Sequence, residues 1–481
     1  MLSPLQIARN KSFLGRKDEL AALHSVDASP EASLVVVYGR RRVGKTELIE
    51  QAYRDRNPLK FEGIEGGAAP RQMEHALYQL SRYAGDAAIQ KLRFSRWLEF
   101  FDYLSRFVDR GTWTLYFEEV QWLAAYDEEF VADLKHAWDN ALRRNPKLVV
   151  VLCGSAPSFM AGKIVRSRAL YGRVSREIRL GPFPFPDTAA FVGAHRSLFD
   201  AFEAQLALGG IPEYLKLVRG ESSTYLALCR HAFLPNAYFL NECDRIFVSS
   251  LARSAHYRTT IEFLAARRSA ARREIAERCG VKAGGNLTAL LDDLESCGFI
   301  EGVIPYDKGP ASKLVRYQIS DPYLQFYYRF IQPQRRAIDS GAFADRPTAA
   351  LPLHHYQQWL GYAFERWCRA HHRRIAELLG FGGVRYRSGA WIERSAGEGF
   401  QFDLVFDRAD HVLTVCEIKY TTAPAGLETA PIFARRTDAL AARRRTTIER
   451  VLISAAGAEP ELARSGGFDR VLTLGDLVGG A

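Results

Sequence analysis

Three short runs of branched and aromatic apolar residues mark the first third of the chain, and stretches with helical periodicity lie between them. The runs are SLVVVY at 33–38, WTLYF at 113–117 and KLVVVL at 147–152. Runs of this length, bounded by turn residues, are typical of strands that are buried on both faces. Strands that alternate with helices predict an α/β fold with a parallel sheet covered by helices on both sides.

Beyond this region the pattern changes twice. Residues 182–255 show amphipathic helix patterns broken by proline and glycine, which we expect to form a helical lid. The stretch 256–334 gives a helix, a turn with glycine, a second helix and apolar strands, which is the order of a winged helix-turn-helix. From 335 to 481, helices precede two strands of alternating polarity, a basic helix and a further apolar strand. We therefore predict four domains, of which the first covers residues 1–181.

The segment SDPYLQFYYRFIQPQRR carries an aromatic stripe. Tyr323, Phe326, Tyr327 and Phe330 are spaced at i, i+3, i+4 and i+7, so a helix would place all four rings on one face. Burial of that face in a core is the favoured interpretation, and stacking on nucleic-acid bases is the alternative.

Composition adds a preference for an acidic partner. With 47% hydrophobic and 25% charged residues the chain resembles an average globular protein, and we expect a packed core. Lys and Arg number 65 against 55 Asp and Glu, which gives a net charge of +10. This basic balance favours a partner such as DNA.

The cysteines and the first residues bear on location. Seven cysteines form no CxxC pair and are odd in number, which favours buried thiols in a reducing cytoplasm over disulfides or zinc. The opening MLSPLQIARNKSF lacks the apolar core of a signal peptide, and no apolar run approaches the ~18 residues of a membrane helix. We expect a cytoplasmic protein with no membrane partner.

The loop GRRRVGKT, from Gly39 to Thr46, follows the first apolar run and precedes a helical stretch, and it fits the pattern GxxxxGKT. Such a loop, with glycines at Gly39 and Gly44, presents unpaired backbone N–H groups and the positive end of a helix to phosphates. Lys45 would neutralise the β and γ phosphates, and Thr46 would ligate Mg²⁺. The sequence thus predicts a site for ATP and Mg²⁺.

Two acids, Glu118 and Glu119, follow the second run. In a P-loop ATPase the first acid holds Mg²⁺ through water, and the second polarises the attacking water. Asp is usual at the first place, and the extra methylene of Glu118 predicts slow hydrolysis, or binding with little turnover. Two exposed acids at the start of a helix are the alternative.

The third run leads into Ser155, where folds of this kind place a polar side chain against the γ-phosphate. Arg173 follows in ALYGRVSREIRL. We interpret Arg173 either as an arginine that reaches the nucleotide of a neighbouring subunit, which implies a homo-oligomer, or as part of a surface ion pair.

Six motifs in chain order now carry a resemblance: FLGRKDEL, VVYGRRRVGKTELI, EEVQWL, GSAPSFM, LYGRVSREIRL and GGIPEYL. Together they resemble the archaeal-type ATPase family, within the AAA+ and STAND branch of P-loop NTPases. The resemblance implies that the first motif, around Gly15 and Arg16, lies near the nucleotide base. It also implies that Pro212 makes the lid contact of STAND proteins.

The second helix of the expected helix-turn-helix should offer Arg, Lys, Asn or Gln to base edges. It offers Asn286 and Thr288, but Asp292, Asp293 and Glu295 follow, and phosphates would repel them. A packing or oligomerisation module is favoured over a reader of DNA sequence.

The stretch QFDLVFDRADHVLTVCEIKY gives two strands of alternating polarity joined by a polar turn. If the turn is 409–411, facing positions add up to 820, so Asp403 faces Glu417. Two carboxylates side by side in a sheet are destabilising unless a cation joins them. Asp403, Glu417 and the carbonyl of Ile418 would hold Mg²⁺ or Mn²⁺. Lys419, on the same face as Glu417, would orient the water.

This hairpin is similar to that of the PD-(D/E)xK nucleases, so the resemblance implies an α/β restriction-endonuclease-like domain. Glu365 in GYAFERW matches the additional metal-binding acid of many such nucleases, whereas Phe402 replaces their usual proline. A basic helix follows and would hold a phosphate backbone. Its arginines are Arg435, Arg436, Arg443, Arg444 and Arg445. A nuclease-like fold used only for binding, and a hairpin with its charges in water, are the alternatives.

Two phosphate- and metal-binding sites in one basic chain lead us to expect an ATPase coupled to a metal-dependent deoxyribonuclease, in DNA processing or defence. The alternative hypothesis is a STAND-like, ATP-dependent switch whose last domain only binds nucleic acid or protein.

Overall fold

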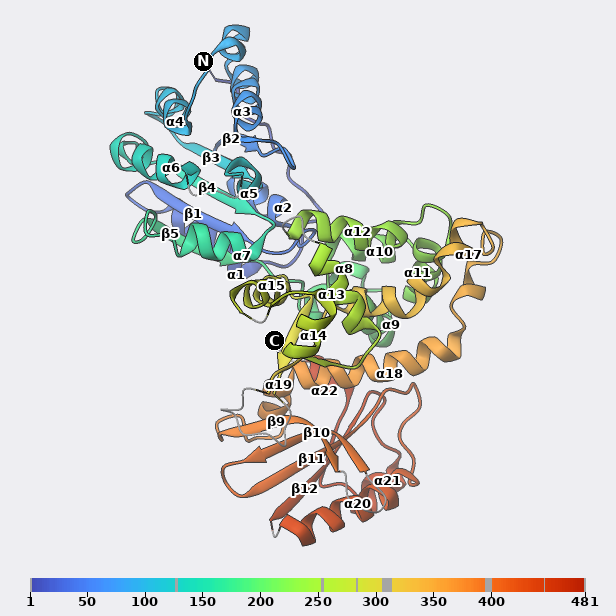
Figure 1. The fold of residues 1–481 in the computed structure, drawn as a ribbon. Coiled ribbons are helices and arrows are strands. Elements are labelled where there is room, and N and C mark those ends of the chain that lie inside the picture. The colour runs from blue at the N-terminus through green and yellow to red at the C-terminus, as the bar shows by residue number, and fades with distance from the viewer. Residues whose placement is uncertain are drawn as a thin grey trace.

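Three parts follow one another along the molecule: an N-terminal sheet domain, a helical middle and a C-terminal sheet domain (Figure 1). The computed structural model describes residues 2–125, 129–251, 255–282, 284–304, 314–393, 400–444 and 446–479.

The N-terminal domain contains a parallel five-stranded sheet in the order β2-β3-β4-β1-β5. The strands are β1 (Ser33–Tyr38), β2 (Asn57–Glu62), β3 (Trp113–Glu118), β4 (Val149–Gly154) and β5 (Val174–Arg179). The α/β class and the parallel sheet predicted from the sequence are confirmed.

Helices cover both faces of this sheet, which explains why β1 is apolar at every position. Val35 and Val37 enter one core with the helices α1 and α2, and Leu34 and Val36 enter the other with α3, α4 and α6. The helices are α1 (Lys17–Asp27), α2 (Lys45–Tyr53), α3 (Ala69–Ala84), α4 (Trp97–Ser105), α5 (Val120–Leu123), α6 (Glu129–Asn140) and α7 (Pro157–Phe159), with short turns η1 (Ala87–Lys91), η2 (Leu142–Arg144) and η3 (Met160–Val165).

The middle begins with five helices in the stretch predicted to be a lid. They are α8 (Phe185–Val192), α9 (Leu198–Leu208), α10 (Pro212–Arg219), α11 (Thr224–Phe233) and α12 (Tyr238–Ser250). Helices and strands then follow in the predicted order, and the strands form an antiparallel sheet β6-β8-β7. These elements are α13 (Ala255–Ala265), β6 (Ala270–Ala271), α14 (Arg272–Cys279), α15 (Gly285–Ser296), β7 (Ile300–Val303) and β8 (Arg316–Ile319).

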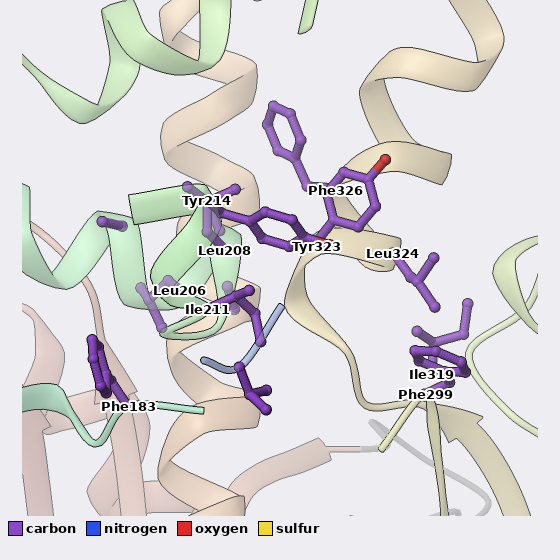
Figure 2. Close-up of a cluster of buried hydrophobic side chains, with 14 of the residues drawn as sticks. Phe183, Leu206, Leu208, Ile211, Tyr214, Phe299, Ile319, Tyr323, Leu324 and Phe326 are labelled. Carbon is purple, nitrogen blue, oxygen red and sulfur yellow. The ribbon is translucent and has the colours of Figure 1, made fainter. Parts of the chain in front are cut away.

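The aromatic stripe lies in α16 (Pro322–Phe326) and the adjoining π-helical turn η4 (Tyr327–Ile331). All four rings are buried. The ring centroids of Tyr323 and Tyr214 are 5.4 Å apart, and Figure 2 shows the two side chains beside each other in the core. The predicted burial of this face is confirmed, so these rings do not lie open to bases.

The C-terminal domain is a mixed sheet in the order β13-β12-β11-β10-β9, antiparallel from β9 to β11 and parallel from β11 to β13. Its helices α18, α19 and α22 cover one face, and α20 and α21 cover the other. The elements after η4 are η5 (Gln332–Gln334), α17 (Arg335–Asp339), η6 (Pro347–Ala350), α18 (Leu353–Ala370), α19 (His372–Leu378), β9 (Tyr386–Glu393), β10 (Phe400–Arg408), β11 (Val412–Lys419), α20 (Thr429–Arg444), β12 (Thr447–Ser454), α21 (Pro460–Arg464), β13 (Arg470–Leu472) and α22 (Leu474–Val478).

All seven cysteines lie in the described ranges and are buried thiols, as predicted. Within those same ranges, no helix combines the length and the apolar character that a membrane crossing requires.

Helix α9 of the middle part joins the C-terminal domain through aromatic contacts. The centroid of the Phe202 ring lies 5.8 Å from that of Phe364 and 5.1 Å from that of Trp367, both on α18. It lies 6.3 Å from the ring centroid of Tyr420, which follows β11. Beside it, Glu203 accepts a 3.4 Å hydrogen bond from the Tyr356 hydroxyl. Burial, together with the nearby Asp200 carboxylate, raises the pKa of Glu203 to about 7.

This raised pKa predicts a pH-dependent stability. A glutamate that binds its proton more tightly in the folded chain adds stability below its unfolded pKa, and the contribution is lost as the pH rises towards 7. Glu203→Gln should therefore unfold at higher denaturant than the unaltered protein at pH 8, with the difference shrinking towards pH 4.5. Urea unfolding at several pH values measures this. Glu74→Gln, at an exposed site on α3, is the control and should show little such trend.

Candidate nucleotide site and C-terminal acidic site

The loop between β1 and α2 has the predicted strand-loop-helix setting. Gly44 has φ 90°, a left-handed conformation that favours glycine, and a Cβ at Gly39 would meet the carbonyl oxygen of Leu180 at 2.1 Å. The Lys45 Nζ donates to the carbonyl oxygens of Gly39 and Arg40, each at 3.0 Å. The ammonium therefore lies within the curve of its own loop, where a phosphate-binding lysine is expected.

The structure brings the predicted Mg²⁺ residues Thr46 and Glu118 together. The Thr46 hydroxyl donates to Glu118 Oε1, which also accepts a 2.7 Å hydrogen bond from the Tyr116 hydroxyl. Lys60 on β2, which the sequence did not single out, forms an ion pair with Glu118 Oε2. Burial acts to raise the pKa of Glu118, but Lys60 and the two hydroxyls outweigh it and lower that pKa.

The predicted water-polarising acid and the γ-phosphate residue also meet. Glu119 Oε2 accepts from the Ser155 backbone N–H at 3.2 Å and from its hydroxyl at 2.6 Å. Gln121 donates to both side chains. The backbone of Glu119 has φ 53°, a costly value for a residue with a Cβ, and such strain is typically retained at functional sites.

Arg16 and Pro212 occupy the edges of this site. Arg16 donates to the carbonyl oxygens of Val43, at 2.9 Å, and Gly181, at 2.7 Å, so it ties the loop to the chain that leaves β5. Pro212 is buried at the first turn of α10. Neither observation establishes a contact with a base or a lid function, and both roles stay predictions.

Arg173 is held within its own chain. Its guanidinium donates two 2.8 Å hydrogen bonds to the two carboxylate oxygens of Asp139. These bonds from Arg173 lower the pKa of Asp139 to about 2. The arrangement matches the ion-pair interpretation, and a role at a neighbouring subunit stays a prediction.

The phosphate loop also makes one buried and one partly buried ion pair that the sequence did not reveal. Arg40 pairs with Asp321, the residue that caps α16, and the two side chains are 7% and 3% exposed. Arg42, at φ 71°, pairs with Glu242 of α12, and Glu242 accepts a 2.9 Å hydrogen bond from the Tyr214 hydroxyl. The only signal in the sequence is the run of three arginines inside the loop.

These pairs are electrostatically strong. Burial acts to lower the pKa of Arg40, but Asp321 outweighs it and raises that pKa. The guanidinium of Arg40 also lies 5.3 Å from the centroid of the Phe299 ring, a cation–π contact. The phosphate loop is therefore fixed by charge to α12 and to the start of α16.

In the C-terminal domain, the predicted register of the hairpin is confirmed. Leu404 faces Cys416 and Asp407 faces Leu413, so facing positions add up to 820. The Asp403 carboxylate accepts a 3.1 Å hydrogen bond from the backbone N–H of Ile418. Burial, and then the Glu365 and Glu417 carboxylates, raise the pKa of Asp403 to about 7. Glu365 and Glu417 therefore lie close enough to Asp403 to disfavour its charged form.

The side chains of two of these acids turn towards cations. Glu417 lies 2.7 Å from the Lys419 ammonium, and Glu365 lies 3.5 Å from Arg369. Across the described ranges, no three His, Cys, Asp or Glu side chains converge as a metal centre requires. The converged set of Asp403, Glu365 and Glu417 that the sequence predicts is not formed there, because each outer acid has a nearer cation. Binding of Mg²⁺ or Mn²⁺ stays a prediction.

The basic helix is α20. Arg435 is exposed and Arg436 is half-buried on it. The predictions for Arg443, Arg444 and Arg445 fall outside the side chains that the structure describes.

This combination of a parallel five-stranded sheet, a GKT loop after β1 and two acids at the end of β3 is consistent with a P-loop NTPase. Residues 13–218 match the family described as an ATPase domain predominantly from Archaea, so the chain carries an ATPase domain of the archaeal type. An uncharacterised protein of Methanocaldococcus jannaschii is 26% identical over 358 residues, which are 74% of this chain and 76% of that protein.

Solved structures give weaker similarity. The Walker-type ATPase of Pyrococcus abyssi is 19% identical with a TM-score of 0.49, and covers 68% of this chain and 99% of its own. The ORC2 protein of Aeropyrum pernix is 13% identical with a TM-score of 0.39, over 68% and 98%. A STAND protein of Pyrococcus horikoshii with a tetratricopeptide repeat sensor is 13% identical with a TM-score of 0.30, over 77% and 53%. TM-scores below 0.5 support no inference about shared function.

The buried pair of Arg40 and Asp321 gives a stability prediction. Asp321→Asn keeps a capping side chain on α16 but leaves the Arg40 charge unpaired, which should cost about 3–5 kcal/mol of unfolding free energy. Adding Arg40→Met removes the orphaned charge and should restore most of the loss. Chemical denaturation measures both. Equal stability of Asp321→Asn and the unaltered protein would contradict the ion pair, and Asp339→Asn on the exposed side of α17 is the control.

Proposed function

We propose that this chain is an ATP-controlled protein that acts on DNA and hydrolyses a phosphodiester at the C-terminal acidic site. The observation that carries the proposal is the position of Asp403, buried within reach of the Glu365 and Glu417 carboxylates, so that burial and these two acids raise its pKa to about 7. Such a site has an excess of negative charge that a divalent cation relieves. It lies on the same chain as a P-loop ATPase domain with a predicted Mg²⁺ site.

The residues fit a hard cation. Asp403, Glu417 and Glu365 supply the carboxylate oxygens that Mg²⁺ and Mn²⁺ prefer. A bound ion would lower the pKa of a coordinated water and stabilise a leaving oxygen. Lys419, 42% exposed and two residues from Glu417, would release its carboxylate partner to the cation and turn towards a scissile phosphate. The exposed Arg435 on α20 would supply a positive charge in the same domain for the nucleic-acid backbone.

Control by ATP rests on the ion pairs of the phosphate loop. Nucleotide phosphates bind where Lys45 now contacts loop carbonyls, and Arg40 and Arg42 in the same loop hold α16 and α12. Helix α16 in turn contacts α18, since the Phe326 ring lies 5.7 Å from Trp359. Because α18 carries Glu365, a change in the phosphate loop has a packed route to the acidic site.

A second candidate is an ATP-dependent switch whose C-terminal domain binds DNA or protein without cutting. The specific support is that Glu417 and Glu365 already have cations close by, as does Glu118 in the ATPase domain. This candidate expects nucleotide retention and no cleavage.

Cleavage separates the two candidates. With DNA, Mg²⁺ or Mn²⁺, and with or without ATP, the unaltered protein should cut, and Lys419→Ala should cut about 100-fold more slowly because a charge at the scissile phosphate is lost. Lys91→Ala, at an exposed lysine far along the chain, is the matched control and should cut normally. Absence of cutting by every form favours the switch. Equal cutting by Lys419→Ala and the unaltered protein removes this site from the explanation.

Metal binding has an independent readout. A ligand present at 100 times its Kd stabilises a folded protein by about 2.7 kcal/mol, so Mn²⁺ should raise the melting temperature by several degrees. Asp403→Asn should lose most of that rise, whereas Thr46→Ala should keep it, because Thr46 belongs to the nucleotide site. A rise that is identical in Asp403→Asn argues against a cation at the acidic site.

A further inference from the structure

A cleft of about 900 Å³ lies outside both sites, between the ATPase domain and the helices of the middle part. One wall is formed by α6, by the turn η3 and by the residues that follow it up to Ala169. Asp293 of α15 and Leu251 line the other side. The turn η3 is π-helical, a rare conformation that occurs most often at functional positions.

The cleft is strongly basic. Lys163, Arg166 and Arg168 line it, and all three are exposed. Neither Arg166 nor Arg168 forms an ion pair within the described residues. The one acid of the lining, Asp293, accepts a hydrogen bond from the Tyr257 hydroxyl. Arg166 and Arg168 thus face one carboxylate that is already engaged, and their positive charge suits a polyanion.

An exposed aromatic side chain follows the lining residues closely in the sequence. Tyr171, two residues beyond Ala169, is 82% exposed. A tyrosine that is left in water next to a row of cations offers a flat surface on which an unpaired base can stack. The aromatic stripe at Tyr323 to Phe330 offers no such surface, because it is buried.

We propose that this cleft binds a single nucleic-acid strand, with its phosphates on Arg166 and Arg168 and a base on Tyr171. The inference rests on the proposed function, since it gives the path of the DNA on which the chain acts. Phosphate contacts fix position without reading sequence. The opposite wall carries Asp293, and the adjacent Asp292 is exposed. Helix α15 therefore contributes no positively charged side chain that could contact base edges. Binding is therefore independent of sequence.

Fluorescence anisotropy with a labelled single-stranded DNA of random sequence tests this on the full chain. The double variant Arg166→Ala with Arg168→Ala should bind about ten-fold or more weakly, because two phosphate contacts are lost. The slope of log affinity against log salt should fall by about 1.4, at about 0.7 for each contact. Arg143→Ala with Arg144→Ala is the matched control, since these exposed arginines precede β4, whereas the cleft arginines follow it. It should bind like the unaltered protein.

The aromatic contact has its own pair of variants. Tyr171→Ala should weaken binding roughly 5-fold or more, and Tyr171→Phe should not, because the ring and not the hydroxyl carries the stacking. Tyr78→Ala, another exposed tyrosine on α3, is the control. Thermal melting of each variant shows whether it is folded.

The outcomes are distinguishable. Unchanged binding by the cleft variants, with DNA bound by the unaltered protein, overturns the cleft and leaves the proposed function standing. No DNA binding by any form overturns both. Displacement of DNA by poly-glutamate as effectively as by unlabelled DNA overturns the assignment of a nucleic acid and points to an acidic protein segment. Tighter binding to duplex than to single strands contradicts the role of Tyr171.

Discussion

The phosphate loop is fixed to the rest of the molecule by charges that have left water. A buried charge without a partner is costly, so the buried Arg40 requires Asp321, and the buried Glu242 requires Arg42. Asp321 also begins α16 by capping it, through a 2.7 Å hydrogen bond from the Leu324 backbone N–H. The conformation of a nucleotide-binding loop and the start of a helix 281 positions away in the sequence are thus one electrostatic unit.

That unit determines how the three parts of the chain relate. Tyr214 contributes to it from the lid, since its hydroxyl bonds to Glu242 and its ring packs on Tyr323. From α16 the packing continues into α18 and the face of the C-terminal sheet that α18 covers. These elements share one hydrophobic core with the face of the ATPase sheet that α1 and α2 cover. A continuous core favours joint movement of these elements over independent motion of separate domains.

Local features of the fold were predictable from the sequence. The apolar strand β1 followed by GRRRVGKT fixes the loop and the start of α2, because the pattern and its chemistry lie within 14 residues of chain. The hairpin register followed from a three-residue turn, in which His411 takes the left-handed conformation at φ 67°. The burial of Tyr323 followed from helical spacing alone.

Partners that are distant in sequence were not predictable. No residue near Arg40 in the sequence indicates that Asp321 is its partner. Lys60 could not be predicted as the partner of Glu118, because a single lysine in a strand has many possible neighbours. The orientation of Glu417 was missed for a related reason. Its facing position was correct, but the ammonium two residues along the same strand lies nearer than any shared cation site. Backbone register fixes which residues meet, whereas side-chain torsions decide which atoms touch.

Helix α18 has 18 residues and therefore spans about 27 Å as a stiff rod. Trp359, in its first half, rests against Phe326 of α16, and Glu365, further along, faces the strands of the acidic site. Trp359 and Glu365 are six residues, or about 9 Å, apart on this helix, so a shift of α18 at Trp359 would change the position of Glu365 relative to Asp403. The distance between the Glu365 and Asp403 carboxylates would then depend on how α16 packs against α18. The local density of negative charge at the acidic site would depend on the same contact.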